Sequence, residues 1–408
     1  MPIRVLLLHR SIGAGPIRLA QALELALGEL DPNAVVKNVN ILDLEYAGRF
    51  RRTAQRALAH IERMPHKVAY VYEQLDRPEN ERQFSLIDRL RFRRNHLRRL
   101  RSQKLLLKSF LPFLQSEPWD VIVNTETYAC GLIASLKRQG KLRTPNFLIT
   151  TDFFMHRSHV NSCDHYFTAT EEGAAHLKAL GVKGRRISVT GTPIHPDFSK
   201  MKARADCLRS QGLIGDRPIV LFIAAGFGAG ATTMPGAEKV FPAILAAKTP
   251  LEIVVVAGNN QQLKTQLEQI PVPAQHRVKI FGFVAPIDEL MRAADAVISK
   301  PGGMVSAEVL ACGAAMVIVN PRPGLEMQNS DFLLENGVAI KNQHLETLPF
   351  QLAQLLNDAE RLALMRSNAL RVARPQAAFD AASKILQWVQ AVKGDDDKAE
   401  CEALASQN

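Results

Sequence analysis

The strongest constraint on the fold is a regular alternation of short apolar runs with helix-like segments along most of the 408 residues. The first apolar run, residues 3–9, ends at a glycine turn, and residues 15–30 then repeat apolar side chains at the three- and four-residue spacing of a helix. The other strand-like runs resemble the first: 34–42, 119–125, 145–153, 165–170, 186–191, 219–226, 251–258, 278–283, 296–300 and 315–320. This alternation predicts an α/β fold with parallel sheets covered by helices.

The alternation stops and restarts near residues 199–216, which divides the chain into two units. The segment GTPIHPDFSKMKA, residues 191–203, turns the chain with two prolines before the pattern restarts. Residues 1–198 and 217–375 are therefore predicted to form two doubly wound domains joined by a linker at 199–216. Residues 376–408 would add a C-terminal helix and a polar tail. Tandem domains of this type bind ligands in the cleft between them, where the carboxyl ends of the strands point.

Positive charge is concentrated in the first half of the chain. Residues 1–200 hold 31 Lys and Arg against 19 Asp and Glu, whereas residues 201–408 hold 20 against 21, for a total net charge of +11. The densest part is Arg82–Lys108, with ten basic residues, one acid, and leucines at helical spacing. This pattern is compatible with a solvated surface helix or with attraction to anionic lipid headgroups, to which each Lys or Arg contributes roughly 1 kcal/mol. Nucleic acid is not expected as a partner, because no recognition motif accompanies the charge.

The composition is typical of a soluble globular protein, with 47% hydrophobic and 22% charged residues. No apolar run is long enough for a membrane-spanning helix, and the first residues lack the cleavage site of a signal peptide. The five cysteines are scattered without metal-ligand spacing, which fits a reducing compartment. We therefore expect a cytoplasmic protein.

Three glycine corners follow predicted strands, at Gly13–Pro16, Gly226–Gly230 and Pro301–Gly303. A helix that begins behind such a corner presents free N–H groups and a partial positive charge, which suit a phosphate. Neither of the first two corners has the complete P-loop or dinucleotide-binding pattern. Glu308 follows the third corner and could reach the ribose hydroxyls of a bound nucleotide. Its alternative role is to compensate the helix dipole.

The third corner carries a resemblance to a known family. The run ISKPGGMVSAEVLACGAAMVIVNPRPGLEMQN, residues 298–329, is similar to the nucleotide-sugar site of the family that includes monogalactosyldiacylglycerol synthases and processive diacylglycerol glucosyltransferases. TDFFMHRSH, GTPIHPDF and AAGFGAG resemble further motifs of that family, in the same order, so that the resemblance covers about residues 1–370. Seven residues match the third-corner motif together: Lys300, Gly302, Gly303, Glu308, Gly324, Glu326 and Asn329.

The resemblance implies a GT-B fold, in which two Rossmann-like domains face a cleft. It also implies an inverting transfer of a hexose from a UDP-sugar to a membrane lipid such as diacylglycerol, without metal or other cofactor. Glu308 would bind ribose, the Gly302–Gly303 corner the diphosphate, and the backbone of residues 283–284 uracil. Glu326 and Asn329 would bind sugar hydroxyls. The complete set implied for the donor is Gly226, Gly228, Phe283, Val284, Lys300, Gly302, Gly303, Glu308, Glu326 and Asn329. The basic region Arg82–Lys108 would dock on the anionic inner face of the membrane as a peripheral contact.

The departures from the family pattern cluster at positions of chemical importance. Pro16 replaces a histidine that is thought to act in catalysis, and proline cannot transfer a proton. Val305 and Leu325 replace a threonine and a glutamine, and His159 replaces a tryptophan. Either another group supplies the base, or catalysis is weak or absent.

Three polar residues at predicted strand ends are candidates for the missing base: Asp152, His156 and Glu126. Asp152 could instead cap the turn that follows it. His9 is also near, but its place in the first strand favours a core role. Two alternatives remain open at this point: a non-catalytic or weakly active nucleotide-binding protein of the same fold, and a transferase with a different acceptor.

Overall fold

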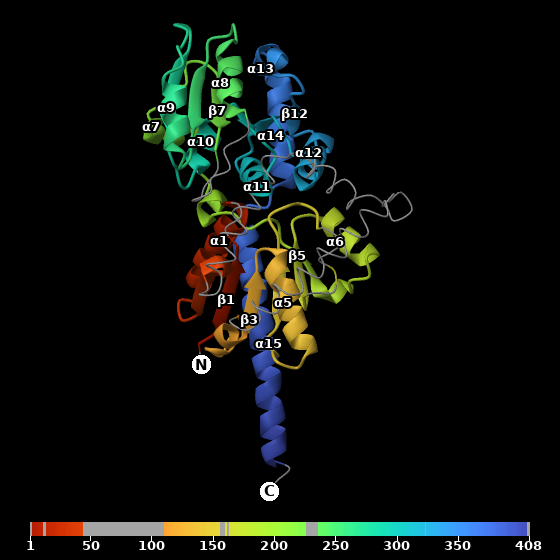
Figure 1. Ribbon diagram of the computed structural model, residues 1–408. Coiled ribbons are helices and arrows are strands. Elements are labelled where there is room, and N and C mark those ends of the chain that lie inside the picture. The colour runs from red at the N-terminus through yellow and green to blue at the C-terminus, as the bar shows by residue number, and fades with distance from the viewer. Residues whose placement is uncertain are drawn as a thin grey trace, which may run out of the picture.

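The computed structural model describes residues 2–10, 14–43, 110–155, 160, 163–225, 236–322 and 324–405. Two α/β domains lie one above the other in Figure 1, with both termini at the far end of the first domain. The predicted region Arg82–Lys108 lies outside the described residues, as do Gly13, His156, His159, Gly226 and Gly228.

The first domain is built on a six-stranded parallel sheet in the order β2-β1-β3-β4-β5-β6. Its strands are β1 Arg4–His9, β2 Val35–Asn40, β3 Val121–Asn124, β4 Asn146–Ile149, β5 His165–Thr168 and β6 Ile187–Val189. Its main helices are α1 Ala14–Leu30, α5 Thr127–Arg138 and α6 Glu171–Ala179. The central strands β1, β3 and β4 are almost completely buried, because helices cover both faces of a parallel sheet.

The second domain repeats this plan in the order β12-β11-β10-β7-β8-β9. Its strands are β7 Ile219–Ile223, β8 Glu252–Val256, β9 Arg277–Phe281, β10 Ala296–Ser299, β11 Ala315–Ile318 and β12 Ala339–Lys341. Its helices are α8 Ala237–Leu245, α9 Gln261–Glu268, α10 Asp288–Ala293, α11 Gly303–Ala311, α12 Leu325–Glu335, α13 Leu348–Leu356 and α14 Ala359–Val372. The predicted pair of doubly wound, Rossmann-like domains is confirmed.

The strand order reverses between β7 and β10 in the second sheet and between β1 and β3 in the first. Ligands of doubly wound folds bind at such switch points, outside the carboxyl ends of the strands. The corner at residues 300–303 directly follows β10, so the fold places this motif at the switch point of the second domain.

The chain crosses between the domains twice. After the second domain, helix α15 (Ala377–Ala405) returns to the first domain and packs along α1 (Figure 1). The Trp388 ring meets Phe147 edge to face at 5.0 Å between centroids, and the Lys393 ammonium lies 2.9 Å from the Asp120 carboxylate. The last helix therefore belongs to the core of the first domain, although it follows the second in sequence.

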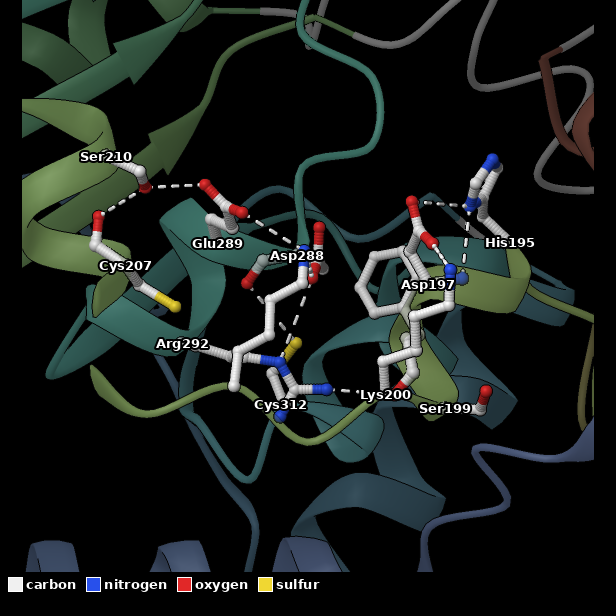
Figure 2. Close-up of polar contacts among 12 residues, drawn as sticks. His195, Asp197, Ser199, Lys200, Cys207, Ser210, Asp288, Glu289, Arg292 and Cys312 are labelled. Atoms are coloured by element: carbon white, nitrogen blue, oxygen red, sulfur yellow. Dashed lines mark hydrogen bonds and ion pairs between the residues drawn. The ribbon is translucent and has the colours of Figure 1, made fainter. Parts of the chain in front are cut away.

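The linker itself is fastened to the second domain by a group of polar contacts that we term the linker cluster: Lys202, Asp288, Glu289 and Arg292. The Lys202 ammonium lies 2.8 Å from Asp288 and 3.1 Å from Glu289, both on α10. Arg292 donates to the carbonyl oxygen of Phe198 at 2.8 Å. Figure 2 shows Glu289 also facing Ser210 of α7 (Arg204–Gln211), whose hydroxyl donates to it at 2.6 Å. The linker and α7 are thus held to α10.

Candidate donor site

The predicted diphosphate corner opens a helix whose N-terminus has no side-chain cap. Gly302, at the N-cap of α11, is extended, with φ −69° and ψ 144°. The first N–H groups of an α-helix have no partner inside the helix and carry part of the helix dipole. The corner therefore has the chemistry of an anion site.

The first domain covers this corner closely. A Cβ atom built on Gly303 would lie 2.0 Å from the carbonyl oxygen of Thr151 and 2.5 Å from its carbonyl carbon. A backbone atom cannot rotate out of the way, so only glycine fits at position 303 in this arrangement. The TDF motif of the first domain and the KPGG motif of the second, far apart in sequence, are in direct contact.

Asn329 of α12 forms the centre of a second contact between the domains. Its side chain is completely buried; it donates to Asp152 Oδ1 at 2.9 Å and to the Pro301 carbonyl at 3.1 Å, and it accepts from the Phe153 N–H at 3.1 Å. Burial raises the pKa of Asp152, although the hydrogen bonds from Asn329 and Thr151 oppose that shift. The structure therefore brings the predicted base Asp152 and the predicted sugar ligand Asn329 together.

Glu308 forms a third contact. Its side chain is 1% exposed, and one oxygen is paired with the guanidinium of Arg18, which is 28% exposed and comes from α1 of the first domain. Burial lowers the pKa of Arg18 to about 10, so that it stays protonated at neutral pH. The predicted ribose ligand thus has a cationic partner from the opposite domain. Arg18 is not among the residues predicted from the sequence, although it is the only basic residue of α1.

Lys300 and Glu326 are also neighbours, with 2.7 Å between the ammonium and the carboxylate. The other Glu326 oxygen accepts from the Arg322 N–H at 2.9 Å. Glu326 lies in the first turn of α12, where a carboxylate also stabilises the helix dipole. Two of the predicted donor residues therefore form one ion pair beside the corner.

Phe283 and Val284 follow β9, the edge strand of the second sheet. The Phe283 side chain is 43% exposed, whereas Val284 is half-buried against the core. Their contact with uracil stays a prediction.

Glu126 has a structural explanation. It precedes α5 and accepts from the Ala129 N–H at 3.1 Å, as an N-cap residue does, and it lies 3.4 Å from Arg10. These contacts favour a capping role over a catalytic one. His9, at the end of β1, is buried, and desolvation lowers its pKa.

No group of three or more His, Cys, Asp or Glu side chains among the described residues is arranged to hold a metal ion. Within the same part of the chain, no helix combines the length and the apolar character needed to cross a bilayer.

Comparisons with known families agree with the motif analysis. The family model described as "Monogalactosyldiacylglycerol (MGDG) synthase" matches residues 86–194, and the model "Glycosyl transferases group 1" matches residues 210–372. The processive diacylglycerol beta-glucosyltransferase of Bacillus licheniformis is 31% identical over 61% of this chain and 63% of its own length. That of Bacillus subtilis is 30% identical over 61% of this chain and 64% of its own. The chain thus matches somewhat less than two thirds of these relatives, and the resemblance to this family is confirmed.

Solved structures share the fold at low sequence identity. MurG of Acinetobacter baumannii is 17% identical, with a TM-score of 0.59 over 95% of this chain and 100% of that one. HepE of Anabaena, solved in complex with UDP-glucose, is 16% identical, with a TM-score of 0.54 over 96% of this chain and 100% of that one. These similarities confirm the predicted GT-B arrangement of two domains.

Proposed function

Since the chain resembles the family of monogalactosyldiacylglycerol synthases and processive diacylglycerol glucosyltransferases, we propose that it transfers a hexose from a UDP-sugar to a membrane lipid such as diacylglycerol, with inversion. The observation that carries the proposal is the uncapped start of α11 at a switch point, with Glu308 and Asn329 beside it. HepE, which has the same fold, binds UDP-glucose.

In this proposal the donor lies on the second domain. The diphosphate takes the N–H groups at Gly302–Gly303, Glu308 takes the ribose, and Asn329 takes a sugar hydroxyl. The first domain now contacts each of these positions, through Thr151, Arg18 and Asp152. Donor entry therefore requires the two domains to separate at this face and to close again around the ligand. This coupling would exclude water from the reaction.

Asp152 is the proposed general base. It accepts the proton of the acceptor hydroxyl while that oxygen attacks the anomeric carbon from the face opposite the UDP leaving group. Burial raises the pKa of its carboxyl, which makes the carboxylate a stronger base. Asn329 orients it through the 2.9 Å hydrogen bond. Pro16, which replaces the histidine of the family pattern, has no group for this role.

The helix dipole of α11 and its free N–H groups stabilise the negative charge that develops on UDP. No metal is required in this scheme. His156 belongs to the same TDFFMHRSH motif as Asp152 and is a second candidate for proton transfer.

The acceptor is proposed to reach the cleft from the cytoplasmic face of an anionic membrane. The charge of the first 200 residues, +12 from 31 basic and 19 acidic residues, favours such a surface. The basic region Arg82–Lys108 is the proposed contact. Sedimentation with anionic and with neutral liposomes tests this step, and protein that stays in the supernatant with both would contradict it.

A second candidate function is nucleotide binding without turnover. It is favoured by Pro16, Val305 and Leu325, and by the contacts that the first domain makes with the donor residues. In this second candidate function, the chain would bind UDP or a UDP-sugar and release it unchanged.

A turnover assay separates the two candidates. Purified protein is mixed with radiolabelled UDP-glucose or UDP-galactose and with liposomes with and without diacylglycerol, and the lipid extract is chromatographed. We expect a labelled glycolipid only where diacylglycerol is present. Thermal protection by UDP without any labelled product would favour the second candidate, and a lack of both would contradict a nucleotide site altogether.

A further inference from the structure

We propose that Arg18 is a diphosphate-binding residue of the donor site, supplied by the first domain. This inference rests on the proposed function, because it names a contact of the same donor. None of the family motifs discussed above includes position 18. Three observations support it: the position of the Arg18 guanidinium, the pairing of the neighbouring Lys300 with Glu326, and the groups that a guanidinium can bind.

The first observation is position. Arg18 is paired with Glu308, which lies five residues after Gly303 on α11. Five residues of α-helix span about 7.5 Å along the axis, which is less than two turns. Ribose and diphosphate are adjacent in a nucleotide, so a guanidinium held at the proposed ribose ligand is also close to the proposed diphosphate position.

The second observation is charge. The corner must neutralise a diphosphate, but Lys300, the cation nearest to it in sequence, is already paired with Glu326 at 2.7 Å. Val305 adds no hydroxyl donor in the first turn of α11, where the family pattern has a threonine. Arg18 is also paired, but in the contacts described only its Nη2 meets Glu308, and 28% of its side chain is exposed. The other N–H groups of its planar fork can therefore reach a diphosphate oxygen.

The third observation is chemical fit. A guanidinium presents five N–H donors in a planar fork and binds a carboxylate and a phosphate with the same geometry. Glu308 can turn one oxygen to the ribose hydroxyls while the fork of Arg18 bridges to the diphosphate. In the bound state, the Arg18–Glu308 ion pair thus becomes a contact among Arg18, Glu308 and the nucleotide, and the diphosphate is neutralised by the Arg18 guanidinium. Because Arg18 belongs to α1, only the closed arrangement would complete the site.

The alternative is that Arg18 only neutralises Glu308 in the protein interior. The two roles differ in one measurable ratio, the affinity for UDP divided by the affinity for uridine, because uridine has the ribose but lacks the diphosphate. If Arg18 binds the diphosphate, its side chain raises this ratio, and replacing it lowers the ratio. If Arg18 only neutralises Glu308, replacing Arg18 in a protein that also carries E308Q leaves the ratio unchanged.

Isothermal titration with UDP and with uridine on the full chain tests the proposal, using wild type, R18Q, R18K, E308Q and the double variant R18Q/E308Q. For R18Q we expect UDP affinity to fall about tenfold or more and uridine affinity to fall less than about threefold, as the loss of one charged hydrogen bond predicts. R18K, which keeps the charge but not the fork, is expected between wild type and R18Q. E308Q should weaken both ligands together.

The double variant decides between the two roles. A low UDP-to-uridine ratio in R18Q/E308Q supports a diphosphate contact, whereas recovery of the wild-type ratio would overturn it. Wild-type protein that binds UDP while R18Q binds it equally well would overturn the role of Arg18 alone. Wild-type protein that binds neither ligand would contradict the proposed donor and, with it, this inference.

Discussion

Two buried carboxylates in the second domain have cationic partners of different origin. Asp288 is 0% exposed and is paired with Lys202 of the linker, which is fastened to the same domain. Glu308 is 1% exposed and is paired with Arg18 of the opposite domain. A buried charge is costly without a partner, so both sites need their cation. The Lys202–Asp288 pair joins the linker to the second domain, whereas the Arg18–Glu308 pair joins the two domains. Under the proposed opening of the domains, only the second pair would separate.

The linker cluster therefore holds the linker on the second domain, whereas the Arg18–Glu308 pair is a contact between the two domains. The linker cluster keeps α7 and the connecting segment on α10, so the proposed opening of the domains would occur at the crossings before and after it. At the second of these crossings the chain passes Gly191, where an added Cβ would lie 2.5 Å from the Cβ of Arg374. The two connections between the domains thus lie side by side, at the place where the proposed opening would pivot.

The largest effect is expected on the transfer rate of D152N, which removes the proposed base and keeps the shape of the side chain. We expect the transfer rate to fall about 10²–10⁴-fold, with UDP affinity nearly unchanged. Rates measured against pH provide the check. Because burial raises the Asp152 pKa above its ordinary value of 3.8, the wild-type rate should fall as the pH drops through that raised pKa. The acidic limb should be absent from the residual activity of D152N.

A glutamine at Glu126 is the matched control for this experiment. Glu126 caps α5, so E126Q should lower stability slightly and leave the acidic limb in place. A D152N enzyme with the wild-type rate and pH profile would exclude Asp152 as the base.

The second largest effect is expected in the linker cluster, on stability. K202M keeps the apolar stem of the side chain but leaves Asp288 buried without its nearest cation, which should cost about 3 kcal/mol of unfolding free energy. K200M is the control: Lys200 is 61% exposed and paired only with Asp197 in the contacts described, so its loss should cost less than about 1 kcal/mol. Urea unfolding measures both.

The ligand affinity of these lysine variants sharpens the comparison. UDP affinity should be the same in K202M and wild type, because the linker cluster takes no part in donor binding. Equal unfolding midpoints for K202M and K200M would show that Asp288 does not depend on Lys202.

The sequence predicted those parts of the molecule that depend on local pattern. The alternating apolar runs predicted both sheets. The KPGG motif predicted the corner at residues 300–303, because strand, turn and helix signals lie next to one another in the chain. Glu126 could also have been recognised as a cap, since it stands directly before a helical run.

The contacts between the domains could not be predicted in this way. Arg18 and Glu308 are 290 residues apart, and no periodicity in either segment specifies how two domains face each other. The same holds for Thr151 on Gly303 and for α15, which returns to the first domain after the whole of the second. The sequence therefore predicted a set of donor residues without the partners that the first domain gives them.

The smallest of the three effects concerns the two glycines of the corner, which form a natural pair. At Gly303 a Cβ would meet the backbone of Thr151 at 2.0 Å, whereas at Gly302 its nearest neighbour would be Val305 Cγ1 at an ordinary 3.8 Å. G303A should therefore lose about 1–3 kcal/mol of stability, and G302A should stay within about 0.5 kcal/mol of wild type, both without ligand. Small-angle X-ray scattering should show a larger radius of gyration for G303A alone, because the domains separate to relieve the clash. If both variants were as compact and as stable as wild type, Thr151 would not lie against Gly303 in solution. The corner would then lack this contact between the domains, and its comparison with the linker cluster would fail.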